Sequence, residues 1–303
     1  MNYVHTSIMP EELLSHLVPQ SPDPIMVDAT CGEGGHTHLF LSAYPDLTVV
    51  GVDRDREIQK KARVRMEAFG NRFKPVSMWF DAFFKEAEDD SFDLILFDLG
   101  ISMFHFDESH RGFSLRKGEP LDMRLDSEDP ISAFDVVNRY DEKKLADVIY
   151  AYGEERYSRR IARAIVQQRK TKTIATTDDL AGIVYKNVPP AYRYQKIHPA
   201  TRTFQAIRIE VNRELDRIEP ALTEAIRTLK VGGRLAVITF HSLEDRPVKW
   251  LFRNLAQEER PVLKILTKKP LVPSEEEVAR NSASRSSKLR IVEKIREEER
   301  HGT

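Results

Sequence analysis

The stretch MVDATCGEGGHTHLF, residues 26–40, joins an apolar strand to a glycine-rich turn and the start of a helix. Glycines at such a turn let the backbone approach a ligand closely. The dinucleotide-binding pattern G-x-G-x-x-G requires a third glycine at position 37, where this chain has Thr37. No Lys-Ser/Thr pair follows, so the stretch is not a phosphate-binding P-loop. The simpler interpretation is a strand-to-helix turn with incidental glycines. The rest of the sequence distinguishes it from a ligand-binding turn.

The sequence on either side predicts a sheet with alternating strands and helices. Apolar strands are expected at 25–30, 47–55, 72–80, 91–100 and 234–242. Amphipathic helices between them predict a doubly wound α/β fold, a parallel sheet with helices on both faces. Between about 104 and 202 the pattern is helical, which predicts an inserted all-helical domain. The expected organisation is 1–103 (first part of the sheet domain), 104–202 (inserted domain, for substrate recognition) and 203–303 (second part).

Composition limits the class of protein. The 303 residues carry a formal net charge of −1, so a nucleic-acid surface would have to be local. The single cysteine, Cys31, excludes an intramolecular disulfide and fits a reducing cytoplasm. No signal peptide and no apolar run of membrane-spanning length is present. The nine histidines lack zinc-type spacing, so no metal is expected. The cysteine content and the lack of a signal peptide predict a cytoplasmic protein.

Three acidic residues end predicted strands. Asp28, Asp53 and Asp98 follow the first, second and fourth strands, and Asp53 lies about twenty residues past the turn, where an acid can bind ribose hydroxyls. Carboxyl ends of parallel strands meet at one edge of a sheet. Such acids suit a ligand with hydroxyls, an amine and a positive centre better than a diphosphate. S-adenosylmethionine has these features, although an acid that only caps the following helix remains an alternative for Asp53.

The chain resembles the bacterial RsmH (MraW) family of S-adenosylmethionine-dependent methyltransferases. The resemblance spans nearly the whole chain and rests on the following motifs: DATCGEGGHT, GVDRD, LFDLGIS, HRGFS, PLDMRLD, YGEERYSRRIARAIV, HPATRTFQAIRIEVNREL, GGRLAVITFHSLEDR and NSASRSSKLR. It implies a class I (Rossmann-like) methyltransferase sheet with an inserted helical domain. It also implies methylation of N4 of a cytidine in the decoding region of 16S rRNA, within the small ribosomal subunit.

The resemblance also implies the cofactor contacts. The family's contact positions match Gly34, Gly35, His36, Asp53, Phe80, Asp98 and His105. His105 stands where the family usually has glutamine, because this chain reads DLGISMFH instead of DLGVSSPQ. A histidine can still donate or accept a hydrogen bond there. No chemistry is expected from Cys31, which replaces a usual aromatic residue.

The residues that act on the target amine are less defined. The amine of cytosine is a poor nucleophile and needs acceptors for its N–H bonds, but this chain lacks the Asp/Asn-Pro-Pro-aromatic motif of many amine methyltransferases. The candidates are Asp98, Ser102, His241 and a backbone carbonyl near Gly100. Residues 239–246 (TFHSLEDR) either form a wall of the target pocket or simply cap a helix. The cytosine itself has to be unstacked.

Two basic stretches are expected to contact RNA. The first is the loop with Arg111, Phe113, Arg116 and Arg124, and the second is a helix with Arg159, Arg160 and Arg163 on one side. A solvated loop and a solvated helix face are the simpler interpretations.

Two other functions compete with methyl transfer. A nicotinamide-dependent dehydrogenase would need the third glycine that Thr37 replaces. A non-enzymatic ribosome-assembly factor would not need the intact Gly34, Gly35, Asp53 and Asp98.

Overall fold

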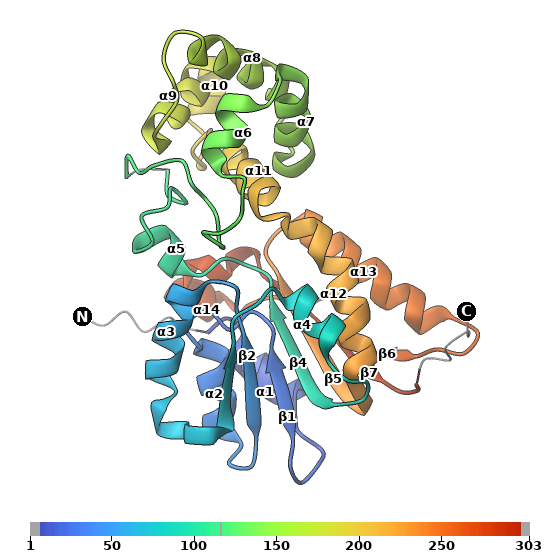
Figure 1. Cartoon of the computed structure of the whole chain (residues 1–303). Coiled ribbons are helices and arrows are strands. Elements are labelled where there is room, and N and C mark those ends of the chain that lie inside the picture. Colours follow the sequence, from blue (N-terminus) through green and yellow to red (C-terminus); the bar gives the residue numbers. More distant parts are fainter. Residues whose placement is uncertain (1–6, 116, 298–303) are drawn as a thin grey trace. The chain divides into compact units, whose positions relative to one another are not determined.

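The structure of the chain, a computed structural model, describes residues 7–115 and 117–297 and divides them into two units (Figure 1). One unit contains the residues up to Ile101 and from Leu215 onward, and the other contains Ser102–Glu214. The helical unit therefore ends later than residue 202, because helix α11 (Thr201–Asn212) packs against its helix α7 (Glu142–Gly153). Arg116, an expected RNA contact, lies outside the described residues.

The first unit is built on a seven-stranded sheet in the order β3-β2-β1-β4-β5-β7-β6. Its strands are β1 (Ile25–Asp28), β2 (Thr48–Val52), β3 (Phe73–Val76), β4 (Phe92–Asp98), β5 (Leu229–Thr239), β6 (Leu263–Ile265) and β7 (Lys288–Lys294). Strands β1 to β5 pair in parallel, and β7 is antiparallel to both β5 and β6. The strand order reverses between β1 and β4, so the ligand edge lies at their carboxyl ends. The expected class I methyltransferase sheet is confirmed.

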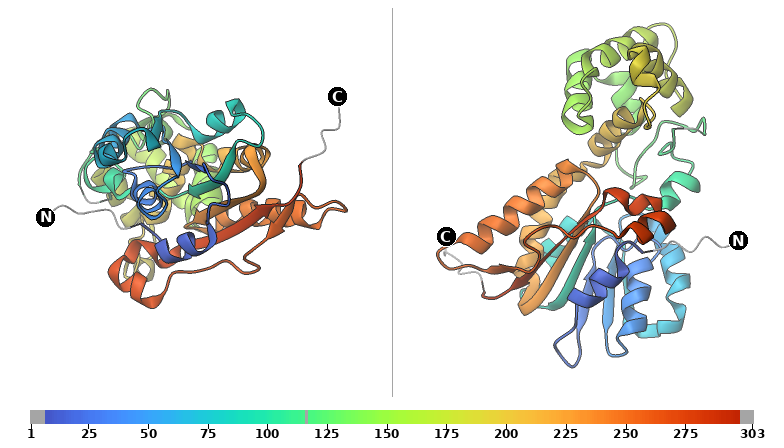
Figure 2. Two further views of the ribbon diagram at one scale, coloured as in Figure 1. Left: turned by 90° about the horizontal axis from the view of Figure 1, so that it is seen from below. Right: turned by 180° about the vertical axis from the view of Figure 1, so that it is seen from behind.

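Helices cover both faces of this sheet because its strands are apolar on both sides. Their bounds are α1 (Pro10–His16), α2 (Gly35–Ala43), α3 (Arg56–Arg65), α4 (Phe80–Glu86), α12 (Glu214–Thr228), α13 (Ser242–Gln257) and α14 (Glu275–Arg280), with 3₁₀ turns at Glu67–Arg72 and Ser282–Ser286. Val27 and Ile95 pack with α4, α12 and α13, whereas Met26 and Leu94 pack with α1, α2 and α3. Figures 1 and 2 show these two helical layers on opposite faces of the sheet.

Three local predictions differ from the structure. The third strand ends at Val76, and Phe80 already begins α4. Strand β5 begins at Leu229 and includes Gly232, whose φ of 84° is tolerated because glycine has no Cβ. The long helical segment breaks at Arg213, with φ 51°, and not at Pro220, which lies inside α12. The buried side chains of Ile218, Ala221 and Leu222 hold α12 against the sheet despite the missing proline N–H.

The second unit consists of helices joined by a long loop. Its helices are α5 (Met103–Asp107), α6 (Ala133–Arg139), α7 (Glu142–Gly153), α8 (Ser158–Arg169), α9 (Thr177–Asn187), α10 (Pro190–Arg193) and α11 (Thr201–Asn212). Side-chain caps begin several of them: Ser132 and Asp135 form a capping box at α6, and Thr176 caps α9. Among the described residues, no helix has the length and apolarity needed to cross a membrane.

Candidate functional site

The turn between β1 and α2 is fixed by backbone hydrogen bonds to the neighbouring strands. The N–H of Ala29 donates to the carbonyl of Leu96 at 2.8 Å, and that of Cys31 donates to the carbonyl of Val52 at 2.9 Å. Gly34 then begins α2 with a φ of 77°, and a Cβ at this position would lie 3.1 Å from Cε of Met66. Conformation and space thus both favour glycine at position 34.

Thr37 explains why the third glycine of a dinucleotide-binding pattern is absent. Its side chain is fully buried, and its hydroxyl donates to Oδ2 of Asp28 at 2.7 Å. The other oxygen of Asp28, Oδ1, is buried without a hydrogen-bond partner in the described part of the chain. Burial raises the pKa of Asp28, and the Thr37 hydrogen bond opposes this effect. The Thr37 side chain thus stabilises the buried Asp28 carboxyl group, whereas a glycine at position 37 would allow closer packing of helix and strand.

Asp53 follows β2 and braces the glycine turn. Its Oδ2 accepts the backbone N–H of Gly32 at 2.8 Å, and its Oδ1 accepts the N–H of Asp55 at 2.8 Å. Asp55, not Asp53, caps helix α3, because it accepts the N–H of Glu57. The turn therefore orients the Asp53 carboxylate at the ligand edge of the sheet.

Asp98 lies at the end of β4 with one oxygen directed at a histidine. Its Oδ2 is 3.7 Å from Nδ1 of His36, whereas its buried Oδ1 accepts no hydrogen bond from any described residue. Burial raises the pKa of Asp98 to about 6; the charges of Asp28 and Glu244 add to the rise, and His36 opposes it. Asp98 thus lies in a buried environment with two other acids, Asp28 and Glu244, and His36 is its closest basic partner.

His36 is held from its other ring nitrogen by the N-terminal segment. Nε2 of His36 lies 3.0 Å from the backbone carbonyl of Ile8, which only accepts, so Nε2 carries a proton. The next residue, Met9, is fully buried with a φ of 52°, and its N–H donates to Oε1 of Glu277 at 2.8 Å. We call Ile8 and Met9 the N-terminal turn. No sequence pattern indicated this contact.

The end of β5 places His241 and Glu244 at the same edge of the sheet. Glu244 is 2% exposed; its Oε2 accepts the N–H groups of Phe240 and His241, and its Oε1 lies 3.0 Å from Nε2 of His241. Residue 241 is thus also the N-cap of α13, as the simpler interpretation held. Nδ1 of His241 is buried and has no hydrogen-bond partner among the residues described. Asp245 instead forms an ion pair with Arg290 at 2.7 Å and does not contact His241 in this way.

Phe80 is the first residue of α4 and is partly buried. Its ring packs edge-on against Phe97 of β4, with centroids 5.6 Å apart. This contact fixes the ring beside the strand that ends in Asp98. Of the predicted cofactor contacts, Gly34, Gly35, His36, Asp53, Phe80 and Asp98 therefore all lie in the sheet unit.

The remaining predicted site residues belong to the helical unit. Ser102 caps α5 by accepting the N–H of Phe104, and His105 is 4% exposed between the rings of Phe104 and Phe113. Phe113 is itself 5% exposed, so its ring is not available for stacking on a base in this conformation. Stacking of a base on Phe113 would require the ring to leave this packing.

The loop arginines hold the loop together. Arg111 donates to the carbonyls of Arg124 and Leu125, and Arg124 pairs with Asp122 at 2.7 Å. The Asp122 hydrogen bond raises the pKa of Arg124 further. Both arginines are thus engaged within the unit, whereas Arg159, Arg160 and Arg163 on α8 are exposed to solvent. Arg163 makes one exposed contact, 3.4 Å to Glu142.

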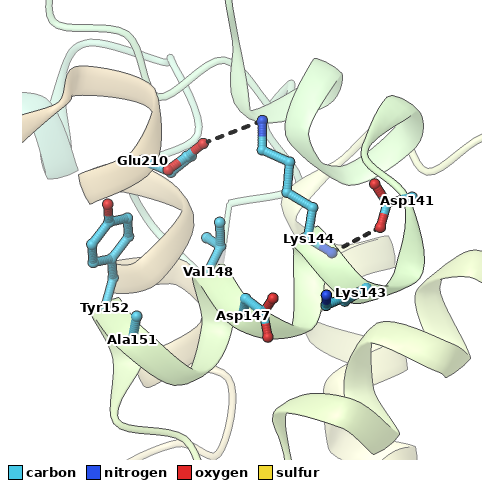
Figure 3. Close-up of a pocket in the computed structure, with 8 residues that line it drawn as sticks. All are labelled: Asp141, Lys143, Lys144, Asp147, Val148, Ala151, Tyr152 and Glu210. Atoms are coloured by element: carbon cyan, nitrogen blue, oxygen red, sulfur yellow. Dashed lines mark hydrogen bonds and ion pairs between the residues drawn. The ribbon is translucent and has the colours of Figure 1, made fainter.

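The helical unit also contains a shallow cavity of about 410 Å³ between α7 and α11. Figure 3 shows Lys144 extending to Glu210 across it, near Asp141, Asp147 and Tyr152. None of the predicted site residues lines this cavity. Among residues 7–115 and 117–297, no group of three or more His, Cys, Asp and Glu side chains is arranged to hold a metal ion.

Comparisons with known proteins agree with the geometry. Residues 2–295 match the model of a family described as "MraW methylase family". A "Ribosomal RNA small subunit methyltransferase H" from Treponema denticola is 50% identical over 97% of this chain and 98% of that protein. One of the same name from a Nostoc species is 46% identical over 96% and 93%. A solved SAM-dependent O-methyltransferase from Thermotoga maritima is similar at 10% identity and a TM-score of 0.44, over 99% of this chain and 71% of that one.

Proposed function

The chain belongs to the MraW methylase family, and on that premise we propose that it transfers a methyl group from S-adenosylmethionine to N4 of a cytidine in 16S rRNA. The observation that carries the proposal is the cluster of Asp28, Asp98 and Glu244 at the ligand edge of the sheet. Asp28 and Asp98 each have one buried carboxylate oxygen without a hydrogen-bond partner among the described residues. A buried, unpaired carboxylate is costly unless a cation approaches it.

The residues present fit S-adenosylmethionine. Asp53 is oriented for the ribose hydroxyls, Phe80 offers a ring face for the adenine, and the turn at Gly34 and Gly35 allows close approach of the methionine end. The free oxygen of Asp98 supplies a negative partner for the cationic part. When bound, the cofactor supplies an electrophilic methyl group on a positive sulfur. Family membership supports neither the dehydrogenase nor the non-enzymatic factor as an alternative.

The protein's part in the transfer is to position the amine and accept its hydrogen bonds. Asp98 and His241 end neighbouring strands, β4 and β5, which pair in register up to Asp98 and Ile238. Asp98 can accept an N–H bond from the cytosine amine. His241 has a buried Nδ1 without a hydrogen-bond partner among the described residues, which can orient the base or take a proton after transfer. Ser102 remains a candidate, although its hydroxyl already caps α5.

We assign RNA binding to the helical unit and place the reaction in the cytoplasm, within the small ribosomal subunit. The exposed arginines of α8, Arg159, Arg160 and Arg163, recur at helical spacing and can contact successive phosphates. Because phosphate contacts fix position and not sequence, choice of the cytidine depends on the residues at the strand ends.

The test is transfer of tritiated methyl from S-adenosylmethionine to small subunits that lack the modification. Digestion of the RNA to nucleosides should place the label in N4-methylcytidine. Label in another nucleoside would contradict the assignment of the amine, and absence of transfer to any subunit preparation would favour a non-enzymatic role. Cofactor affinity measured by calorimetry separates a failed site from a missing substrate.

A further inference from the structure

A short segment of the helical unit exposes apolar side chains that no described residue covers. Residues 194–197, Tyr-Gln-Lys-Ile, connect α10 to α11, and all four are exposed. Tyr194 is 83% exposed and Ile197 is 63% exposed, which are high values for large apolar side chains. We call these four residues the exposed segment. An aromatic and an aliphatic side chain next to a lysine offer contact area together with charge, as binding surfaces do.

The exposed segment is fixed at both ends. Before it, the Arg193 guanidinium donates to the carbonyls of Val188 and Lys186 and lies 5.1 Å from the ring centroid of Tyr185. After it, the ring of His198 stacks on the same Tyr185, with centroids 6.3 Å apart and an interplanar angle of 23°. One tyrosine thus holds both flanks, and the four residues between them project from a defined base.

The charge around the segment favours an anionic partner. Residues 156–209 contain twelve Lys and Arg but only two acids, Asp178 and Asp179, in a chain whose net charge is −1. The cavity between α7 and α11 differs, because Lys144 is directed at Glu210 there and two aspartates also line it (Figure 3). Along the sequence, positive charge is therefore concentrated in the stretch that contains the exposed segment.

We propose that the exposed segment binds single-stranded RNA, with a base stacked on Tyr194 and a phosphate contacted by Lys196. The proposal rests on the proposed function and adds a contact to the RNA that flanks the target cytidine. Base stacking on an exposed aromatic ring beside cations is how proteins hold unpaired strands without reading their sequence. An unstacked target leaves neighbouring nucleotides with exposed faces, and Ile197 extends the apolar surface on which they can pack.

The test measures binding of a fluorescein-labelled oligouridine of about twelve nucleotides to the full chain by anisotropy. Tyr194→Ala should weaken binding by about 5- to 150-fold, the range for one lost base stack, while Tyr194→Trp retains it. The control is Tyr150→Ala, because Tyr150 is 65% exposed on α7, outside the basic stretch, and its loss should leave binding unchanged.

Salt dependence separates stacking from charge. Lys196→Gln should reduce the slope of log affinity against log salt by about 0.7, the value for one phosphate contact on a single strand, whereas Tyr194→Ala should leave the slope unchanged. Oligouridine binding by Tyr194→Ala equal to that of the unmodified chain would overturn the proposal. The proposal would also be overturned if Tyr194→Ala bound oligouridine normally and lost affinity only for the proteins of the small subunit. Methyl transfer by the unmodified chain tests the proposed function separately, so the two failures are distinguishable.

Discussion

The backbone carbonyl of Ile8 accepts a hydrogen bond from Nε2 of His36 at 3.0 Å, so the N-terminal turn orients the ring that faces Asp98. The turn is itself fixed by the bond from the Met9 N–H to Glu277. His36 is therefore positioned by a segment that lies outside the sheet and its ligand edge.

Removing the anchor of the N-terminal turn should weaken cofactor binding. Glu277→Ala leaves the buried N–H of Met9 unpaired, which costs about 1–3 kcal/mol of the free energy of unfolding and loosens the contact to His36. Glu277→Gln retains an acceptor oxygen and is the matched control. Calorimetry with S-adenosylmethionine should show reduced affinity for the alanine variant only. A destabilised Glu277→Ala protein with normal cofactor affinity would limit the turn to a structural role.

Cofactor affinity should decline as the pH falls through about 6. The pKa of Asp98 is raised to about 6, and only the ionised carboxylate attracts a cationic ligand. At pH 5 about a tenth of Asp98 is ionised, so affinity should be about tenfold lower than at pH 8. Asp98→Asn should bind weakly at every pH between 5 and 8. An equally steep pH dependence in that variant would assign the effect to another group.

The same carboxyl group should reduce stability at neutral pH. The pKa of Asp98 is higher in the folded protein, about 6 against an ordinary 3.8, so the unfolded chain loses this proton first as the pH rises. The contribution of Asp98 to the free energy of unfolding therefore decreases by about 3 kcal/mol between about pH 4 and pH 6. It stays at this lower value above pH 6. Denaturant titrations should show Asp98→Asn to be more stable than the unmodified chain at pH 8, with little difference at pH 4.

Asp53 should account for part of the cofactor affinity. Asp53→Asn keeps one acceptor for the Gly32 N–H but removes the charge, and it should weaken S-adenosylmethionine binding by about 1.5–3 kcal/mol. Asp46→Asn, an exposed acid in the same unit, is the control. Unchanged affinity of the Asp53 variant would show that the residue only braces the turn.

The arginines of α8 should act on RNA and not on the cofactor. Charge reversal of Arg159, Arg160 and Arg163 to Glu should weaken binding of small subunits and reduce its salt dependence, because fewer counterions are released. Cofactor affinity should stay within twofold of the unmodified chain, as judged by calorimetry. Loss of cofactor binding with intact subunit binding would reverse the proposed division between the units.

His241 should affect the transfer step itself. His241→Ala should lower the single-turnover methylation rate by about 100-fold if the ring takes part in proton transfer. Binding of S-adenosylmethionine should be near normal. Because residue 241 is also the N-cap of α13, His241→Asn places a side chain favoured at N-caps there and tests the structural alternative. A fully active asparagine variant would leave Asp98 and backbone carbonyls as the acceptors.

The sheet and its acids were predictable because they follow local patterns. Apolar runs that end in Asp28, Asp53 and Asp98 are visible in the sequence, and parallel strands bring their carboxyl ends together. Phe80 begins a helix instead of ending a strand, and its ring packs against Phe97 of β4; its contact with the cofactor stays a prediction.

Contacts between distant segments were not predictable. The bond from His36 to the carbonyl of Ile8 involves the backbone, so no side-chain pattern marks it. The helix break at Arg213 instead of Pro220 depends on how α12 packs against the sheet. The internal roles of Arg111 and Arg124 depend on a folded loop, whose partners are set by the whole unit.

The position of β5 in the sheet has a consequence for synthesis of the chain. Strand β4 pairs with β1 on one side and with β5 on the other, but β5 is encoded only after the entire helical unit. During translation, the apolar β4 therefore presents an unpaired edge until Leu229 has emerged. Such edges promote association between chains, so cotranslational misfolding should concentrate in this interval.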